Sequence, residues 1–231
     1  MSEKAFDADG EIVHAVMRPK DAATLILVKR ESEPRVLMGQ RHSGLAFMAG
    51  KYVFPGGRVD PADQRIAATS ELRPEVQEKL CVGATPARAR GLAMAAIRET
   101  FEETGVIVGV RAEKCPRTRS SAWAKYFAHG IMPQLDALDF IARAITPPNR
   151  PRRFDARFFM ADASAIAHEI EDASNEELLK PCWLTLAEAR AFDLPSITRR
   201  ILEEVEARLS IGPRPVLFFK FNRGKASLTY L

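Results

Sequence analysis

Three glutamates in one short stretch have the type and spacing needed to bind a metal ion. Residues 91–104, GLAMAAIRETFEET, have the pattern of a helix, and Glu99, Glu102 and Glu103 occupy positions i, i+3 and i+4 of it. At about 100° per residue, their side chains fall on one face of such a helix. Crowded carboxylates repel one another, and their oxygens are ligands that Mg²⁺ prefers. A solvated acidic face is the alternative reading of this pattern.

The same stretch shows which face should be buried. Met94, Ile97 and Phe101 fall within about 60° of one another and form an apolar stripe opposite the glutamates. Gly105 follows directly, and glycine at the C′ position commonly ends a helix. We therefore expect a helix that packs on the core through the stripe and presents its acidic face to a ligand.

A longer motif surrounds this helix. FPGGRVDPAD lies upstream, so five residues separate Gly57 from Asp63, and the helix ends in Arg98-Glu99-x-x-Glu102-Glu103-x-Gly105-Val106. This arrangement resembles the Nudix box. Asp63 stands where the family usually has glutamate, and the spacer 64–97 has 34 residues where the pattern has about seven. The excess is an insertion of about 27 residues, which a loop tolerates at small entropic cost.

The resemblance implies a fold, a cofactor and residue roles. The fold would be a Nudix-like α/β/α sandwich with a mixed sheet, one domain over 1–231, with helical insertions. Glu99, Glu102 and Glu103 would bind Mg²⁺ or Mn²⁺ or position its water. Arg98 would hold the helix through a carboxylate pair, so the resemblance implies a catalytic set of Glu99, Glu102 and Arg98. One of the glutamates, or another from 169–177, would act as the base.

The loop before the box narrows the expected substrate. Arg41, Leu45, Gly50 and FPGG match the signature of Nudix coenzyme A diphosphatases, whereas His42 and Ala46 depart from it. The resemblance therefore implies hydrolysis of a diphosphate in a nucleoside-diphosphate-linked substrate, with coenzyme A or an acyl-CoA favoured. NADH, nucleotide sugars and dinucleoside polyphosphates remain alternative substrates. A ligand-sensing protein without activity is a third reading, which the intact glutamates disfavour.

Four further residues are candidates for substrate binding. Gly56 and Gly57 would let the backbone turn tightly beside metal or phosphate, although a simple turn would also use them. Arg41 would bind a phosphate, or else lie at the surface at a strand end. Arg157 would meet an anion from the strand 152–160, unless it forms an ion pair with Asp155.

Alternating strands and helices favour a mixed α/β fold. Residues 22–30 and 35–41 predict a hairpin, and Thr185 is a plausible N-cap. The insertion is expected over about 64–90, and added helices over about 121–146. The expected elements are strands at 22–30, 35–41, 51–54, 106–110, 152–160 and 215–221, with helices near 70–80, 86–90, 91–104, 121–145, 185–192 and 196–209.

Composition indicates an ordinary globular chain. It carries 34 Lys and Arg against 30 Asp and Glu, a formal charge of +4, with the arginines scattered, so no nucleic-acid partner is expected. Three cysteines without a CxxC pair disfavour zinc or a disulfide framework. No apolar run reaches the ~20 residues that span a bilayer. We expect a cytoplasmic protein that acts on a small nucleotide-like molecule, away from membranes, and that can form a homodimer.

Overall fold

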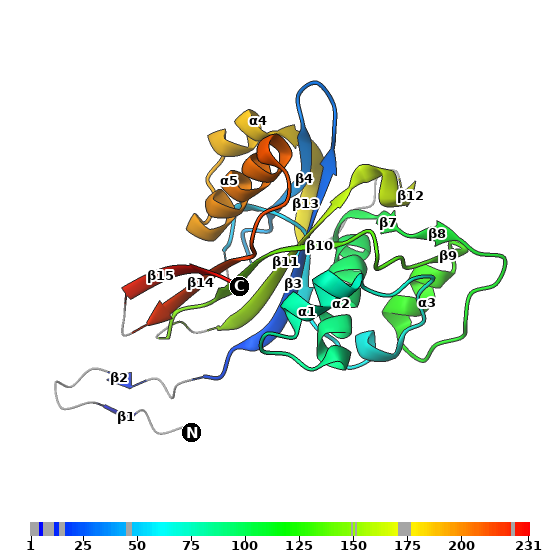
Figure 1. The fold of residues 1–231 in the computed structure, drawn as a ribbon, viewed down its shortest axis with the longest axis horizontal. Helices are drawn as coiled ribbons and strands as arrows, with labels where there is room; N and C mark the ends of the chain where they lie inside the picture. The colour runs from blue at the N-terminus through cyan, green and yellow to red at the C-terminus, as the bar shows by residue number, and fades with distance from the viewer. Residues whose placement is uncertain are drawn as a thin grey trace.

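The computed structural model describes residues 5–6, 12–13, 17–44, 48–148, 150, 152–170, 177–222 and 225–231. Its centre is a mixed sheet of nine described strands, in the order β13-β4-β3-β11-β10-β14-β15, with β5 beside β4 and β6 beside β3 (Figure 1). The pairs β3–β11 and β10–β14 are parallel, and the other pairs are antiparallel. The strands of this sheet are β3 (Lys20–Lys29), β4 (Arg35–Arg41), β5 (Tyr52–Val53), β6 (Gly56–Arg58), β10 (Asp139–Ile145), β11 (Phe154–Asp162), β13 (Leu178–Thr185), β14 (Leu217–Asn222) and β15 (Lys225–Tyr230).

Helices and short strand pairs complete the described chain. The short strands pair as β1 with β2, β7 with β12 and β8 with β9. Their bounds are β1 (Ala5–Phe6), β2 (Ile12–Val13), β7 (Val106–Val108), β8 (Val110–Arg111), β9 (Ile131–Met132) and β12 (Ile166–Glu169). The helices are η1 (Asp63–Arg65), α1 (Pro74–Leu80), α2 (Pro86–Thr104), α3 (Ser121–Phe127), η2 (Ala163–Ala165), α4 (Leu186–Ala191) and α5 (Ser196–Ile211).

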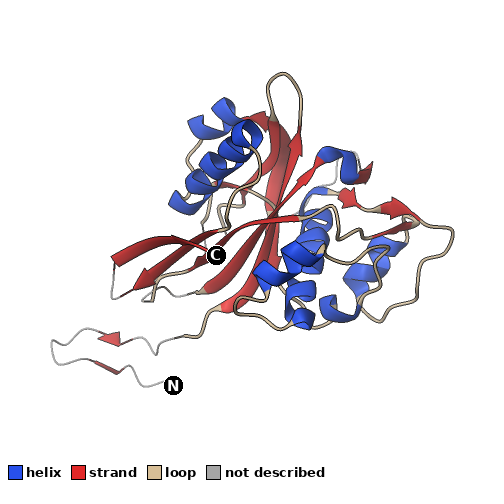
Figure 2. Cartoon of the chain, viewed as in Figure 1, coloured by secondary structure: helices blue, strands red, loops and turns tan. Residues whose placement is uncertain are grey.

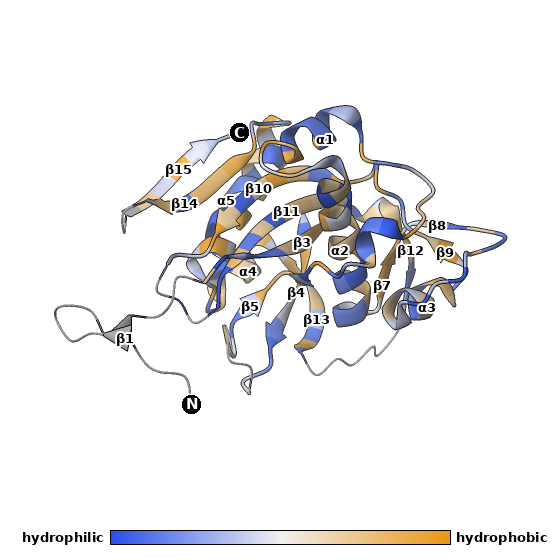
Figure 3. Cartoon of the chain, turned by 90° about the horizontal axis from the view of Figure 1, so that it is seen from below, coloured by the Kyte–Doolittle hydropathy of each residue, from blue (hydrophilic) through white to orange (hydrophobic). Residues whose placement is uncertain are grey.

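The two faces of the sheet are covered by different helices, α1 to α3 on one side and α4 and α5 on the other (Figures 1 and 2). Strand β3 shows why, because its side chains alternate between the faces. Leu25 and Leu27 lie in the core beneath α2, whereas Ile26 and Val28 lie in the core beneath α5. Figure 3 shows the hydrophobic colouring along β14 and the hydrophilic colouring on the outer helix α1. The predicted α/β/α sandwich is thus confirmed.

Helix α2 is longer than expected. Thr85 caps its N-terminus by accepting a hydrogen bond from the Arg88 backbone N–H, and Gly105, with φ of 72°, ends it. Gly91 does not interrupt it, so the helix predicted at 86–90 is its first turn. A Cβ at Gly91 would lie 2.7 Å from Cγ of Gln64. Glycine therefore lets the start of the insertion pack closely on the helix.

The prediction of helix over 121–145 is wrong for its second half. Only Ser121–Phe127 is helical, and Asp139–Ile145 forms strand β10. Phe140 belongs to one core and Ile141 to the other, so both faces of the strand are buried. Its two edges pair with β11 and β14. A strand buried on both faces has a continuous apolar run, which a helical period also fits.

Other predicted elements agree with the structure. Strands β3 and β4 form the expected hairpin. Thr185 caps α4 and forms a reciprocal capping box with Glu188. Strand β15, which pairs with β14, was not expected. None of the helices in the described ranges is long and apolar enough to cross a bilayer.

Candidate active site

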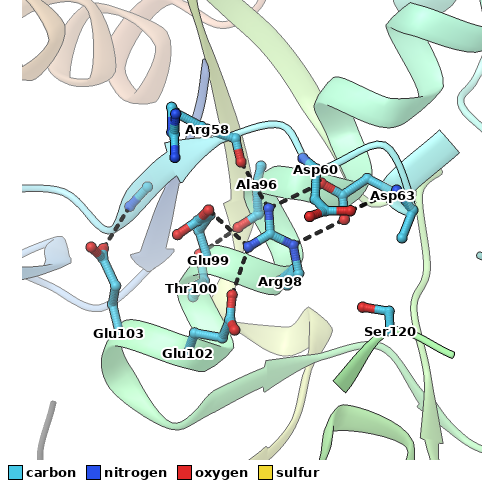
Figure 4. Close-up of polar contacts among 12 residues, drawn as sticks. Arg58, Asp60, Asp63, Ala96, Arg98, Glu99, Thr100, Glu102, Glu103 and Ser120 are labelled. Carbon is cyan, nitrogen blue, oxygen red and sulfur yellow. Dashed lines mark hydrogen bonds and ion pairs between the residues drawn. The ribbon is translucent and has the colours of Figure 1, made fainter. Parts of the chain in front are cut away.

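Arg98 joins two of the motif glutamates to the rest of the protein. Its Nη1 lies 2.8 Å from Oε1 of Glu99 and 2.6 Å from Oε2 of Glu102. On its other side Nε and Nη2 form a fork with Asp63, at 2.9 and 3.0 Å, and Nη2 also donates to the carbonyl of Arg58 at 2.8 Å (Figure 4). Hydrogen bonds and opposite charges raise the pKa of Arg98 above its usual value despite burial. The carboxylate pair expected for Arg98 is therefore present.

Asp63 is the buried end of this chain of contacts. Its side chain has no exposure, and it accepts hydrogen bonds from the indole N–H of Trp123 at 2.8 Å and from the Asp60 backbone N–H at 2.8 Å. Trp123 is itself fully buried on α3. The carboxylate oxygens of Asp63 thus accept hydrogen bonds from Arg98, Trp123 and a backbone amide. These hydrogen bonds fix the position of the side chain.

Glu99 and Glu103 point from α2 toward strand β6. Oε2 of Glu103 accepts the backbone N–H of Gly56 at 2.8 Å, and Oε1 lies 3.9 Å from Nη1 of Arg41. A Cβ at Gly57 would lie 2.5 Å from Oε2 of Glu99. The two glycines were expected in a tight turn, but both lie in β6 beside β3. Gly57 leaves space for the Glu99 carboxylate, whereas Gly56 lets β6 lie close to the backbone of Ala23 and Thr24.

Burial changes the acid–base chemistry of these two glutamates. Loss of solvation raises the pKa of Glu99 to about 7, although Arg98 opposes the change. Loss of solvation also raises the pKa of Glu103 to about 8, against the hydrogen bond from Gly56. Two carboxylates that resist ionisation beside each other form a site that a bound cation would stabilise.

The donor set fits a hard divalent cation, but the three carboxylates do not converge as they stand. In the part of the chain that the structure describes, no three His, Cys, Asp or Glu side chains gather closely enough to hold a metal ion. Glu102 is turned to Arg98, whereas Glu103 is turned to Gly56. Carboxylate oxygens near a glycine backbone suit Mg²⁺ or Mn²⁺. Binding through all three glutamates would require Glu102 to rotate.

Arg157 does not join this cluster. Only 1% of it is exposed, and its Nη1 lies 2.7 Å from Oδ1 of Asp155 and 3.5 Å from Oδ1 of Asp21. Burial lowers the pKa of Arg157 from its usual value. Arg88 contacts the same two aspartates, and Arg143 contacts Asp155. The ion pair with Asp155, the alternative considered above, is what the structure shows, and Arg157 has no surface to offer a substrate.

Sequence reasoning missed some contributors. Nothing in the spacing connects Trp123 to Asp63, 60 residues earlier, because the contact arises from the packing of α3. The contact between Arg98 and the backbone carbonyl of Arg58 could not be predicted from the sequence either, since every residue type has a backbone carbonyl. Leu45 and Ala46 of the coenzyme A signature lie outside the described residues, and so do 171–176 of the segment considered for the base.

Comparisons with known proteins show the family of this chain and the similarity of its fold. The model of the NUDIX domain family matches residues 18–205. The chain is similar to "Uncharacterized Nudix hydrolase NudL" of Salmonella heidelberg, 39% identical over 72 residues, which is 31% of this chain and 36% of the relative. The chain thus spans about a third of the length of the curated relatives it matches. The crystal structure of a NUDIX hydrolase from Alicyclobacillus acidocaldarius is similar, with a TM-score of 0.65 and 27% identity, over 86% of this chain and 100% of that one.

A family model that covers most of the chain decides its membership: the protein belongs to the Nudix family. Nudix hydrolases in general use divalent metal ions and act on small nucleotide-like substrates. The carboxylates of Glu99, Glu102 and Glu103 could hold such an ion.

Proposed function

We propose that the protein is a metal-dependent Nudix diphosphatase, which cleaves a diphosphate bond in a nucleoside-diphosphate-linked molecule. One observation carries the proposal: Arg98, anchored on buried Asp63, holds Glu99 and Glu102 at the end of α2. A sensor that binds ligand without chemistry does not need this arrangement. Coenzyme A or an acyl-CoA is the favoured substrate because of the loop before the box. NADH, nucleotide sugars and dinucleoside polyphosphates are the alternatives.

Different residues of the proposed site would have different roles in hydrolysis. Glu99, Glu102 and Glu103 would hold Mg²⁺ or Mn²⁺, which supplies charge to the diphosphate oxygens and lowers the pKa of a water. Arg98 would hold Glu99 in place without touching the substrate, and Glu102 would turn from Arg98 toward the metal. Water attacks one phosphorus, a new P–O bond forms, and the bridging P–O bond breaks with its electrons on the leaving phosphate. The proton of the water would pass to a carboxylate, either one of these three glutamates or a glutamate from 169–177.

Arg41 and the glycine strand would bind the substrate. Arg41 is 17% exposed in its side chain and lies beside Glu103, so its guanidinium is within the same site. A guanidinium suits a phosphate because its fork matches two oxygens. Gly56 and Gly57 would let the diphosphate approach the backbone of β6.

The test is a panel of substrates read by mass. Coenzyme A, acetyl-CoA, NADH, ADP-ribose and a dinucleoside polyphosphate are each incubated with purified protein and Mg²⁺, Mn²⁺ or EDTA. We expect metal-dependent release of adenosine 3′,5′-bisphosphate from coenzyme A. Cleavage of another member keeps the reaction and changes the substrate, whereas no turnover of any member with either metal removes the proposal.

A pair of variants connects the reaction to the helix. Glu102→Gln should lower turnover by about 10³-fold or more, because it removes a charge from the proposed metal site. Glu78→Gln is the matched control, since Glu78 is exposed on α1, and it should leave turnover unchanged. Near-normal activity of Glu102→Gln would separate this glutamate from the chemistry.

A further inference from the structure

A concave surface lies beside the segment that carries Asp63. Its volume is about 450 Å³, and its walls come from the segment after η1 and from the loop that leads into α3. Arg65 belongs to the first wall, and Arg117 and Arg119 belong to the second. We call this feature the arginine pocket. No acidic residue lines it.

The charges of the pocket are not balanced by the protein. Within the described ranges, none of Arg65, Arg117 and Arg119 forms an ion pair, whereas Arg90, also near η1, pairs with Glu71 at 2.8 Å. All three are exposed, so each can turn its guanidinium toward a ligand. Three cations around one concavity repel one another, and an anion with several oxygens would reverse that repulsion.

Hydroxyl groups and an apolar floor add to the basic walls. Thr118 and Ser120 line the pocket, and their oxygens accept backbone N–H groups of Ser120 and Trp123. Their O–H hydrogens remain as donors. The floor contains Ile66 and Phe127, which are 6% and 7% exposed. Such a surface accepts the apolar parts of a nucleoside, while guanidinium and hydroxyl donors accept a phosphate.

The pocket is tied to the proposed catalytic residues through Asp63. Ala62 and Arg65 of its wall flank Asp63 in sequence, and Asp63 is bonded to Arg98 at 2.9 Å. Figure 4 draws Ser120 in the same view as Asp63, Arg98 and Glu102. The first wall begins the insertion between Asp63 and Arg98, so this insertion gives the protein a surface that a short box would lack.

We propose that the arginine pocket binds a phosphate monoester carried by a nucleoside, separate from the diphosphate that is cleaved. The bound phosphate can belong to the substrate, and this assignment rests on the proposed function. It can also belong to a separate effector that carries a phosphate monoester. The pocket would then favour substrates with a third phosphate, and its contribution would appear in KM more than in kcat.

The first experiment measures binding without catalysis. Adenosine 3′,5′-bisphosphate is titrated by calorimetry, in EDTA, into the wild type, the Arg117→Gln/Arg119→Gln variant and the control Arg111→Gln/Arg199→Gln, which removes two exposed charges elsewhere. We expect the pocket variant to bind about 10–100-fold more weakly, in proportion to two lost charge-assisted contacts, and the control to match the wild type. Equal affinity of all three proteins overturns the proposal, whether or not the protein hydrolyses anything.

The second experiment assigns the source. Coenzyme A and 3′-dephospho-coenzyme A differ by one phosphate monoester, so the ratio of their kcat/KM values isolates its contribution. A preference for coenzyme A that falls at least about tenfold in the pocket variant assigns the pocket to the substrate. A ratio that does not change, with nucleotide binding lost in calorimetry, assigns the same pocket to an effector. Failure of the proposed function itself would appear differently, as no hydrolysis by the wild type.

Discussion

Gly57 offers a sharp test of the carboxylate arrangement. A Cβ at this position would lie 2.5 Å from both Cδ and Oε2 of Glu99, and 2.7 Å from Oε1. Ordinary contact begins at 3.4 Å, so Gly57→Ala must displace the Glu99 carboxylate by about 0.9 Å. The obstacle is the end of a flexible side chain, so the fold should persist.

The displacement is large against the tolerance of a metal site. Ligand distances in such sites hold within about 0.2 Å, so Glu99 would no longer fit a site shared with Glu102 and Glu103. We expect Mn²⁺ affinity to fall by about 10–100-fold, the range for mutations that misplace ligands. This corresponds to about 1.4–2.8 kcal/mol of binding free energy.

The assay is Mn²⁺ titration by calorimetry or electron paramagnetic resonance, with urea unfolding in parallel. Gly56→Ala is the matched control, because its Cβ would lie 2.5 Å from the backbone oxygen of Ala23 and 2.7 Å from Cα of Thr24. That clash is with backbone and should cost about 1–3 kcal/mol of folding free energy. Wild-type Mn²⁺ affinity in folded Gly57→Ala would refute the placement of Glu99 in a metal site.

Three further predictions concern charge. Because burial raises the pKa values of Glu99 and Glu103 above their unfolded values, the native state binds more protons, and the metal-free protein should lose stability as pH rises from about 4.5 to about 8. The increase in Tm that Mg²⁺ produces should therefore be larger at pH 8.5 than at pH 6; an increase independent of pH would contradict this. Arg41→Ala should raise KM by about 10–100-fold with little change in kcat. Arg157→Met should leave KM unchanged. It should cost about 1–3 kcal/mol of folding free energy, because Asp155 is still paired with Arg143 in this variant. Steady-state kinetics and urea unfolding would distinguish the two variants, and a raised KM for Arg157→Met would restore it to the substrate site.

The local patterns of the sequence determined much of the sandwich. Thr185 and Gly105 mark helix ends through capping, which depends on a few neighbouring residues. Helix 91–104 showed its apolar stripe directly, and the spacing of Glu99, Glu102 and Glu103 predicted a shared acidic face. These features follow from periodicity and backbone chemistry, so they needed no knowledge of distant segments.

Only the tertiary structure decided how the site is assembled. Burial, more than the neighbouring charge of Glu99, raises the pKa of Glu103, and the packing of α3 brings Trp123 to Asp63, 60 residues away. The same is true of the strand Asp139–Ile145, which is extended because two neighbouring strands and two cores surround it. A sequence shows which groups are available, whereas distances between remote groups, and the water removed from around them, depend on how the whole chain packs.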